Sequence, residues 1–113
     1  MGRIEKVFTE LHDRGCKAFI AYITAGDPTL EATVTLVREF EKQGVNIIEL
    51  GIPFSDPVAD GPVNQEASMR ALKHNVTLGQ ILNSVKEIRK ESQIPIIFFC
   101  RRTICFRIWN IFH

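Results

Sequence analysis

Residues 49–61 read Glu49-Leu50-Gly51-Ile52-Pro53-Phe54-Ser55-Asp56-Pro57-Val58-Ala59-Asp60-Gly61, and this stretch decides the fold. The apolar run Val45–Leu50 that leads into it predicts a strand whose end carries a carboxylate. The residues that follow contain two prolines and two more carboxylates, and they close on a glycine, which is typical of a loop. The sequence therefore predicts a buried strand that delivers an acidic loop at its carboxyl end.

Upstream of this stretch the pattern predicts a helix, a strand and a second helix. Apolar residues at helical spacing from Ile4 to Leu11 predict a short helix that ends near Gly15. The near-continuous apolar run Ala18–Thr24 predicts a strand that is covered on both faces. Asp27-Pro28 predicts the start of the second helix, with the acid as its N-cap, and Gly44 ends that helix.

Downstream the alternation continues with two helices and a third strand. Pro62 opens a short helix that runs to Asn75, and Thr77 with Gln80 forms a capping box for the next helix. Pro95–Phe99 then begins a strand. Because strands alternate with helices along the chain, we expect an α/β fold with parallel strands joined by right-handed crossovers.

Composition places the 113-residue chain among ordinary globular proteins with one small domain. The net charge of +1 favours neither a nucleic-acid surface nor a membrane surface. We expect no signal peptide, because Met1–Asp13 is charged and lacks an apolar core. Cys16, Cys100 and Cys105 have no metal-ligand or redox spacing, which favours a reducing, cytoplasmic setting.

Glu49 is the first candidate for chemistry. Side chains alternate along a strand, so Glu49 shares a face with Ile47. In a closed α/β barrel that face points into the interior, and barrels place their active sites at the carboxyl ends of the strands. A poorly hydrated carboxylate there suits a group that takes and gives protons near neutral pH. The alternative is an ordinary strand end in which Glu49 pairs with a surface lysine.

The other candidates have competing structural roles. Asp60 stands before Gly61-Pro62, where it would cap the next helix. Asp56 lies in a turn-forming sequence, and turn geometry explains it as well as any contact does. Tyr22 is either a core residue or the wall of a pocket, on the same face of its strand as Thr24. No function is assigned to the three histidines, His12, His74 and His113.

Residues 49–61 resemble, almost residue for residue, the signature of tryptophan synthase α subunits. Three more segments resemble the same family, and the resemblance runs from about residue 4 to residue 99: Ala21-Tyr22-Ile23-Thr24-Ala25-Gly26-Asp27-Pro28, Gly44–Leu50 and Asp60–Ala67. The resemblance implies a (β/α)₈ barrel, of which this chain carries about the first three β/α units. It also implies a lyase of tryptophan biosynthesis that cleaves indole-3-glycerol phosphate to indole and glyceraldehyde 3-phosphate.

Site residues carry over position by position. By this resemblance Glu49 is the catalytic acid and base, and Asp60 engages the indole N–H as positive charge develops there. Tyr22 is an aromatic wall of the indole pocket. The loop from Pro53 to Asp60 orders over the site and touches the β subunit, with Pro53 and Asp56 as contact positions. The resemblance implies no cofactor in this subunit, because pyridoxal phosphate belongs to the partner β subunit of an α₂β₂ tetramer.

The chain departs from the family in length and at its end. An eight-stranded barrel takes about 250 residues, so the later strands with their phosphate-binding loops are missing. The alternative function is therefore an inactive fragment that retains a surface for the β subunit. Residues 1–99 form the barrel-like part, and the tail 100–113 departs from the family. A one-base shift across Ile104–Phe112 permits codons for Phe-Val-Phe-Gly-Tyr-Gly-Ile, so we hypothesise a frameshift near residue 100.

Overall fold

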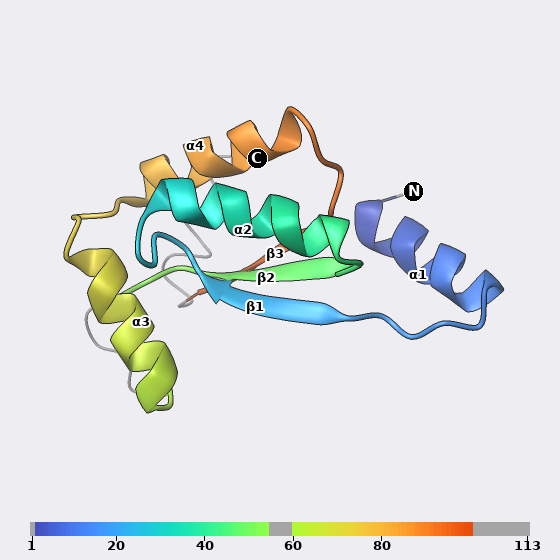
Figure 1. The fold of residues 1–113 in the computed structure, drawn as a ribbon, viewed down its shortest axis with the longest axis horizontal. Coiled ribbons are helices and arrows are strands. Elements are labelled where there is room, and N and C mark those ends of the chain that lie inside the picture. The colour runs from blue at the N-terminus through green and yellow to red at the C-terminus, as the bar shows by residue number, and fades with distance from the viewer. Residues whose placement is uncertain (1, 55–59, 101–113) are drawn as a thin grey trace.

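A computed structural model describes residues 2–54 and 60–100 of the chain. Its elements follow the order α-β-α-β-α-α-β that the sequence predicts, namely α1 (Arg3–Asp13), β1 (Ile20–Thr24), α2 (Leu30–Lys42), β2 (Ile47–Gly51), α3 (Pro62–Leu72), α4 (Leu78–Arg89) and β3 (Ile96–Phe99). The three strands form one parallel sheet in the order β1-β2-β3 (Figure 1). The predicted α/β class with parallel strands is confirmed.

Helices α2 and α4 cover one face of the sheet (Figure 1). Beneath them lies a core of fully buried apolar side chains from these helices and from β2, including Val37, Ile48, Leu50, Ile81 and Ile88. Full burial of each such side chain contributes about 1.5–3 kcal/mol. The core therefore fixes which residues of β2 point toward the helices, and Glu49 is left on the opposite face.

The opposite face of the sheet has no helical layer in the described residues. Ile20 is 44% exposed and Phe99 is 55% exposed. The prediction that Ala18–Thr24 is covered on both faces is therefore wrong for this structure, because α2 and α4 cover only one face. The side chains of Tyr22, Glu49 and Phe99 belong to the uncovered face, as the register and the alternation of side chains require.

The helix ends follow local capping chemistry, with one correction. Thr77 and Gln80 form the predicted capping box of α4, and Gly44 adopts a positive φ of 97° just after α2. The prediction that Asp27 caps α2 is wrong. Thr29 is the N-cap instead, and its side chain accepts a hydrogen bond from the backbone N–H of Ala32.

Two helices lie at opposite ends of the strands. Helix α1 lies beside the amino ends of the strands, and α3 lies beside their carboxyl ends (Figure 1). Helix α3 is shorter than predicted, since it ends at Leu72 rather than at Asn75, which has a positive φ of 51°.

None of the helices in the described residues is long and apolar enough to span a bilayer. The frameshift hypothesis concerns residues 101–113, which lie outside the described part.

Candidate active site

Glu49 and Tyr22 are direct neighbours at the carboxyl end of the sheet. The strand register pairs Tyr22 with Glu49 and Glu49 with Ile97, so the three side chains share the uncovered face. The Glu49 side chain is half-buried. The ion pairs among the described residues are Arg38–Glu91, Arg70–Asp27 and Lys90–Glu87, so none of these includes Glu49. The described structure thus gives no support to the alternative in which Glu49 pairs with a surface lysine.

The Tyr22 ring lies across strand β2 at Gly51. A Cβ atom placed on Gly51 would collide with the Tyr22 hydroxyl and would lie 2.7 Å from Cζ of the ring. The ring meets Phe99 of β3 edge to face, with 5.8 Å between the ring centroids and an interplanar angle of 88°. Glycine at position 51 and an aromatic side chain at position 99 therefore hold the Tyr22 ring over the end of the sheet.

Asp60 approaches the same place from the start of α3. The prediction that Asp60 caps α3 is wrong, because the N-cap is Gly61, one residue later. The backbone carbonyl of Asp60 accepts a hydrogen bond of 2.8 Å from Nε2 of Gln65. The Asp60 side chain is half-buried and is free of the capping role that the sequence favoured.

The pKa of Tyr22 depends on both of the other predicted site residues. Burial raises the pKa of the Tyr22 hydroxyl above its ordinary value, and a hydrogen bond with the Thr24 side chain acts in the opposite direction. The negative charges of Asp60 and then Glu49 raise the pKa of Tyr22 further. Both carboxylates are therefore close enough to act on the same phenol. An aromatic wall flanked by two carboxylates is able to hold a planar apolar ring and to exchange protons with it.

The remaining predicted residues fall elsewhere. Pro53, predicted to contact a partner, is buried, so this structure presents no exposed surface at that position. Asp56 lies outside the described residues. His12 and His74, to which no function is assigned, are exposed, and His113 is outside the described part. A group of three or more side chains suited to a metal ion does not occur among residues 2–54 and 60–100.

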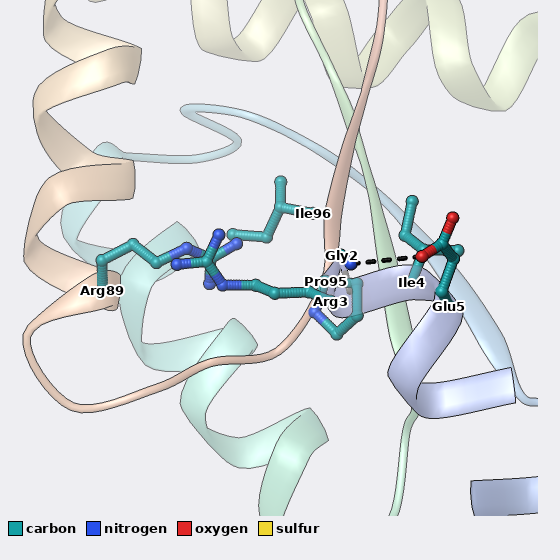
Figure 2. A pocket seen from close by; sticks show the side chains of 7 residues that line it. All are labelled: Gly2, Arg3, Ile4, Glu5, Arg89, Pro95 and Ile96. Carbon is teal, nitrogen blue, oxygen red and sulfur yellow. Dashed lines mark hydrogen bonds between the residues drawn. The ribbon is translucent and has the colours of Figure 1, made fainter. Parts of the chain in front are cut away.

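A separate pocket of about 400 Å³ lies at the other end of the sheet, between α1, the end of α4 and the start of β3 (Figure 2). Arg3 and Arg89 extend toward each other along it. Burial first and then the charge of Arg3 lower the pKa of Arg89, whose Nη1 donates to the carbonyl of Ile94 at 2.7 Å. None of the predicted site residues lines this pocket, so it is distinct from the candidate site.

Gly51 and Phe99 contribute to the site although the sequence did not single them out. Gly51 follows Glu49 by two residues, and Phe99 is two residues after Ile97, which pairs with Glu49. The period of two along each strand places them on the face of Glu49, so alternation was the available signal. What the sequence did not provide was the register between strands, that is, which residue of β3 lies opposite which residue of β2.

Known proteins place the chain in one family. The sequence model of that family, the tryptophan synthase alpha chain, matches residues 8–108. The tryptophan synthase alpha chain of Clostridium kluyveri is 46% identical over 107 residues, which are 95% of this chain and 41% of the relative.

Two solved structures agree with this match. Tryptophan synthase subunit alpha of Legionella pneumophila is similar with a TM-score of 0.90 at 40% identity, over 96% of this chain and 42% of that one. A tryptophan synthase a2b2 complex from Pyrococcus furiosus contains a chain with a TM-score of 0.74 at 40% identity, over 80% of this chain and 36% of that one.

The chain therefore spans about two fifths of the length of the relatives that it matches. Its three strands and their helices correspond to part of the (β/α)₈ barrel of those proteins. Sequence and fold agree: the chain belongs to the tryptophan synthase alpha chain family.

Proposed function

We propose that this chain supplies the acid–base part of the site that cleaves indole-3-glycerol phosphate to indole and glyceraldehyde 3-phosphate. One observation carries the proposal: Glu49 lies beside Tyr22 at the carboxyl end of the sheet, and the charges of Asp60 and Glu49 both raise the pKa of the Tyr22 hydroxyl. Barrel enzymes place their chemistry at this end of the strands. The reaction class is that of a carbon–carbon lyase.

Each residue has a distinct role in this proposal. Glu49 accepts the proton of the glycerol hydroxyl and delivers a proton to the indole carbon at which the bond breaks. The bond between that carbon and the glycerol chain breaks as its electron pair returns to the indole ring, and the glycerol carbon becomes an aldehyde. Asp60 stabilises the positive charge that develops on the indole nitrogen, because a carboxylate lowers the energy of a nearby cation. Tyr22 forms an apolar wall for the ring.

The proposed partner is the β subunit of tryptophan synthase, which in this proposal carries the pyridoxal phosphate. The a2b2 complex of the Pyrococcus furiosus relative supports a partner of this kind. Pro53 and Asp56 are the proposed contact positions. Since Pro53 is buried here, its contact with a partner requires this residue to become exposed on binding.

A second candidate function follows from the length of the chain. Because it spans about 41% of a curated relative, the substrate phosphate would have to be bound by elements that correspond to the other part of that relative. We propose as the alternative that these 113 residues act only as a binding piece for the β subunit. The same alternative includes the proposed division into a barrel-like part, residues 1–99, and a departing tail, residues 100–113. Reading the coding DNA across codon 100 for a second frame that resembles the family tests this division.

Release of indole from indole-3-glycerol phosphate separates the two candidates. The purified chain is measured alone and with the β subunit, beside the Glu49→Gln variant as the matched control. We expect release that depends on Glu49 if the first candidate holds. A chain that binds the β subunit in sedimentation experiments and yields no indole would contradict the first candidate and support the second.

A further inference from the structure

A bidentate ion pair joins the turn after β1 to helix α3. Nε of Arg70 donates to Oδ1 of Asp27 at 2.8 Å, and Nη2 of Arg70 donates to Oδ2 at 3.0 Å. The two residues are 43 positions apart in the sequence. A two-bond contact between guanidinium and carboxylate fixes orientation as well as distance. The pair therefore constrains how α3 lies against the carboxyl end of the sheet.

The turn that carries Asp27 is itself rigidly held. Gly26 has a positive φ of 85°, and its backbone N–H donates to Oγ1 of Thr33 in α2 at 2.9 Å in a buried position. A Cβ atom on Gly26 would lie 2.8 Å from Cγ2 of Val76, so only glycine fits there. Asp27 is therefore a fixed anchor for Arg70 on the strand side of the contact.

Helix α3 has few other anchors. Its buried residues are Ala67, Ser68 and Ala71, all of them small. Because apolar stabilisation scales with the area buried, these side chains hold the helix weakly compared with the leucines and isoleucines of α4. An oriented ion pair near the end of such a helix therefore adds a directional constraint that the small buried side chains do not provide.

Asp60 is tied to the same helix. Gln65 of α3 donates to the backbone carbonyl of Asp60, and Gly61 forms the N-cap directly after it. A displacement of α3 therefore displaces Asp60 relative to Glu49 and Tyr22, which belong to the sheet. We propose that Arg70, anchored by Asp27, is a positioning residue that holds the Asp60 carboxylate at the candidate active site. This inference rests on the proposed function for the meaning of the Asp60 position, and its test does not use that activity.

The chain contains one tyrosine, so the titration of Tyr22 reports on the position of Asp60 without any substrate. The charge of Asp60 raises the pKa of the Tyr22 hydroxyl. The titration is followed by absorbance of the phenolate, in the full 113-residue chain and in Arg70→Met. We expect Arg70→Met to lower the pKa of Tyr22 as Asp60→Asn does. Loss of a nearby positive charge alone would shift this pKa upward, so the two explanations differ in sign.

Three further variants complete the experiment. Lys73→Met removes a positive charge from the end of the same helix at an exposed position, and we expect it to leave the pKa of Tyr22 unchanged. Arg70→Met combined with Asp60→Asn should titrate like Asp60→Asn alone. The charge exchange D27R with R70D restores an ion pair of opposite direction, and we expect it to return the pKa of Tyr22 toward that of the parent chain.

The outcomes separate cleanly. An unchanged or raised pKa in a folded Arg70→Met variant overturns the proposal, and so does an equal shift in Lys73→Met. If circular dichroism shows that Arg70→Met does not fold, the exchanged pair decides: a restored pKa supports the positioning role, and an unrestored one rejects it. A failure of indole release leaves this titration unaffected, so the two proposals fail independently.

Discussion

At the scale of single residues, the candidate site depends on the absence of a side chain. Gly51 leaves the space that the Tyr22 hydroxyl and ring occupy, between β2 and the flanking Phe99. Its role is steric, because its φ lies outside the left-handed region. A residue without a side chain thus decides where an aromatic ring lies.

Gly51→Ala is expected to destabilise the chain by about 1–3 kcal/mol, because a Cβ atom would overlap the Tyr22 ring and force it to move. The measurement is the free energy of unfolding in urea. Gly79→Ala is the matched control, since its nearest neighbouring atom, Oγ1 of Thr77, is 3.9 Å away. In a Tyr22→Leu background the cost of Gly51→Ala should shrink. An equal cost in both backgrounds would refute the steric explanation.

Tyr22 should make stability depend on alkaline pH. Its pKa in the folded chain lies above the ordinary value of 10.0, chiefly because of burial. The unfolded chain therefore loses the phenol proton first as pH rises through 10.0, and the free energy of unfolding falls until the folded chain also ionises. Below pH 10.0 the phenol is protonated in both states, and the stabilisation that Tyr22 contributes is fully present. Urea unfolding of the parent chain and of Tyr22→Phe across this range should differ in slope, and parallel curves would contradict the expectation.

At the scale of elements, local chemistry sets where the helices begin. Thr77 accepts a hydrogen bond from the backbone N–H of Gln80 at 3.2 Å, and Oε1 of Gln80 accepts one from the backbone N–H of Thr77 at 3.0 Å. This capping box starts α4, which carries Ile81 and Ile88 into the core. The placement of these core residues therefore depends on a pair of exposed polar groups.

Thr77→Ala should cost about 1 kcal/mol of stability, because it leaves backbone donors at the start of α4 unsatisfied. Thr35→Ala is the control, because Thr35 is exposed within α2 and its hydroxyl only bonds back to the carbonyl of Glu31 at 3.0 Å. We expect the control to be neutral or slightly stabilising, since alanine favours helix. Thermal unfolding of both variants measures the contrast, and equal losses would argue against the capping role.

The sequence predicted elements better than it predicted their contacts. Some features depend only on neighbours within a few residues, and these could be predicted from the sequence: the capping box, the helical spacing and the apolar strand runs. Asp27 shows the limit: Asp-Pro favours a helix start locally, but Arg70, 43 residues away, binds the carboxylate instead. Asp60 shows the same limit, because the N-cap of α3 is Gly61 and not Asp60 as the local pattern predicted. The pairing of Tyr22 with Glu49 depends on the strand register and the approach of Asp60 depends on the placement of α3, and no local pattern contains either.

At the scale of the whole molecule, one layer of helices leaves apolar surface on the second face of the sheet. Ile20 and Phe99 are each more than two fifths exposed there, and Ile97 lies on the same face. Exposed apolar side chains that lie near one another bind hydrophobic ligands more readily than isolated ones do. We therefore expect hydrophobic ligands to bind the uncovered face of the sheet rather than the face covered by α2 and α4.

The uncovered face should bind a fluorescent apolar dye, and Ile97→Thr should weaken that binding while it keeps the β-branched shape suited to a strand. The control is Val63→Thr, because Val63 is 76% exposed and belongs to helix α3 rather than to a strand of the sheet. Fluorescence titration measures the affinity, and circular dichroism confirms that both variants stay folded. Equal loss in the two variants would show that the dye does not use this face.

The strands lie in the sheet in the same order in which they occur along the chain. Tyr22 meets Glu49 across 27 residues, and Ile48 meets Ile96 across 48 residues, so closing the second loop costs only about 0.5 kcal/mol more than closing the first. A chain that emerges from the ribosome is thus able to add each strand to an edge that already exists, without inserting one between two others. Tyr22 and Glu49 both precede Asp60 along the chain, so the strand pair that carries them is complete in the sequence before the residue that approaches them from the start of α3.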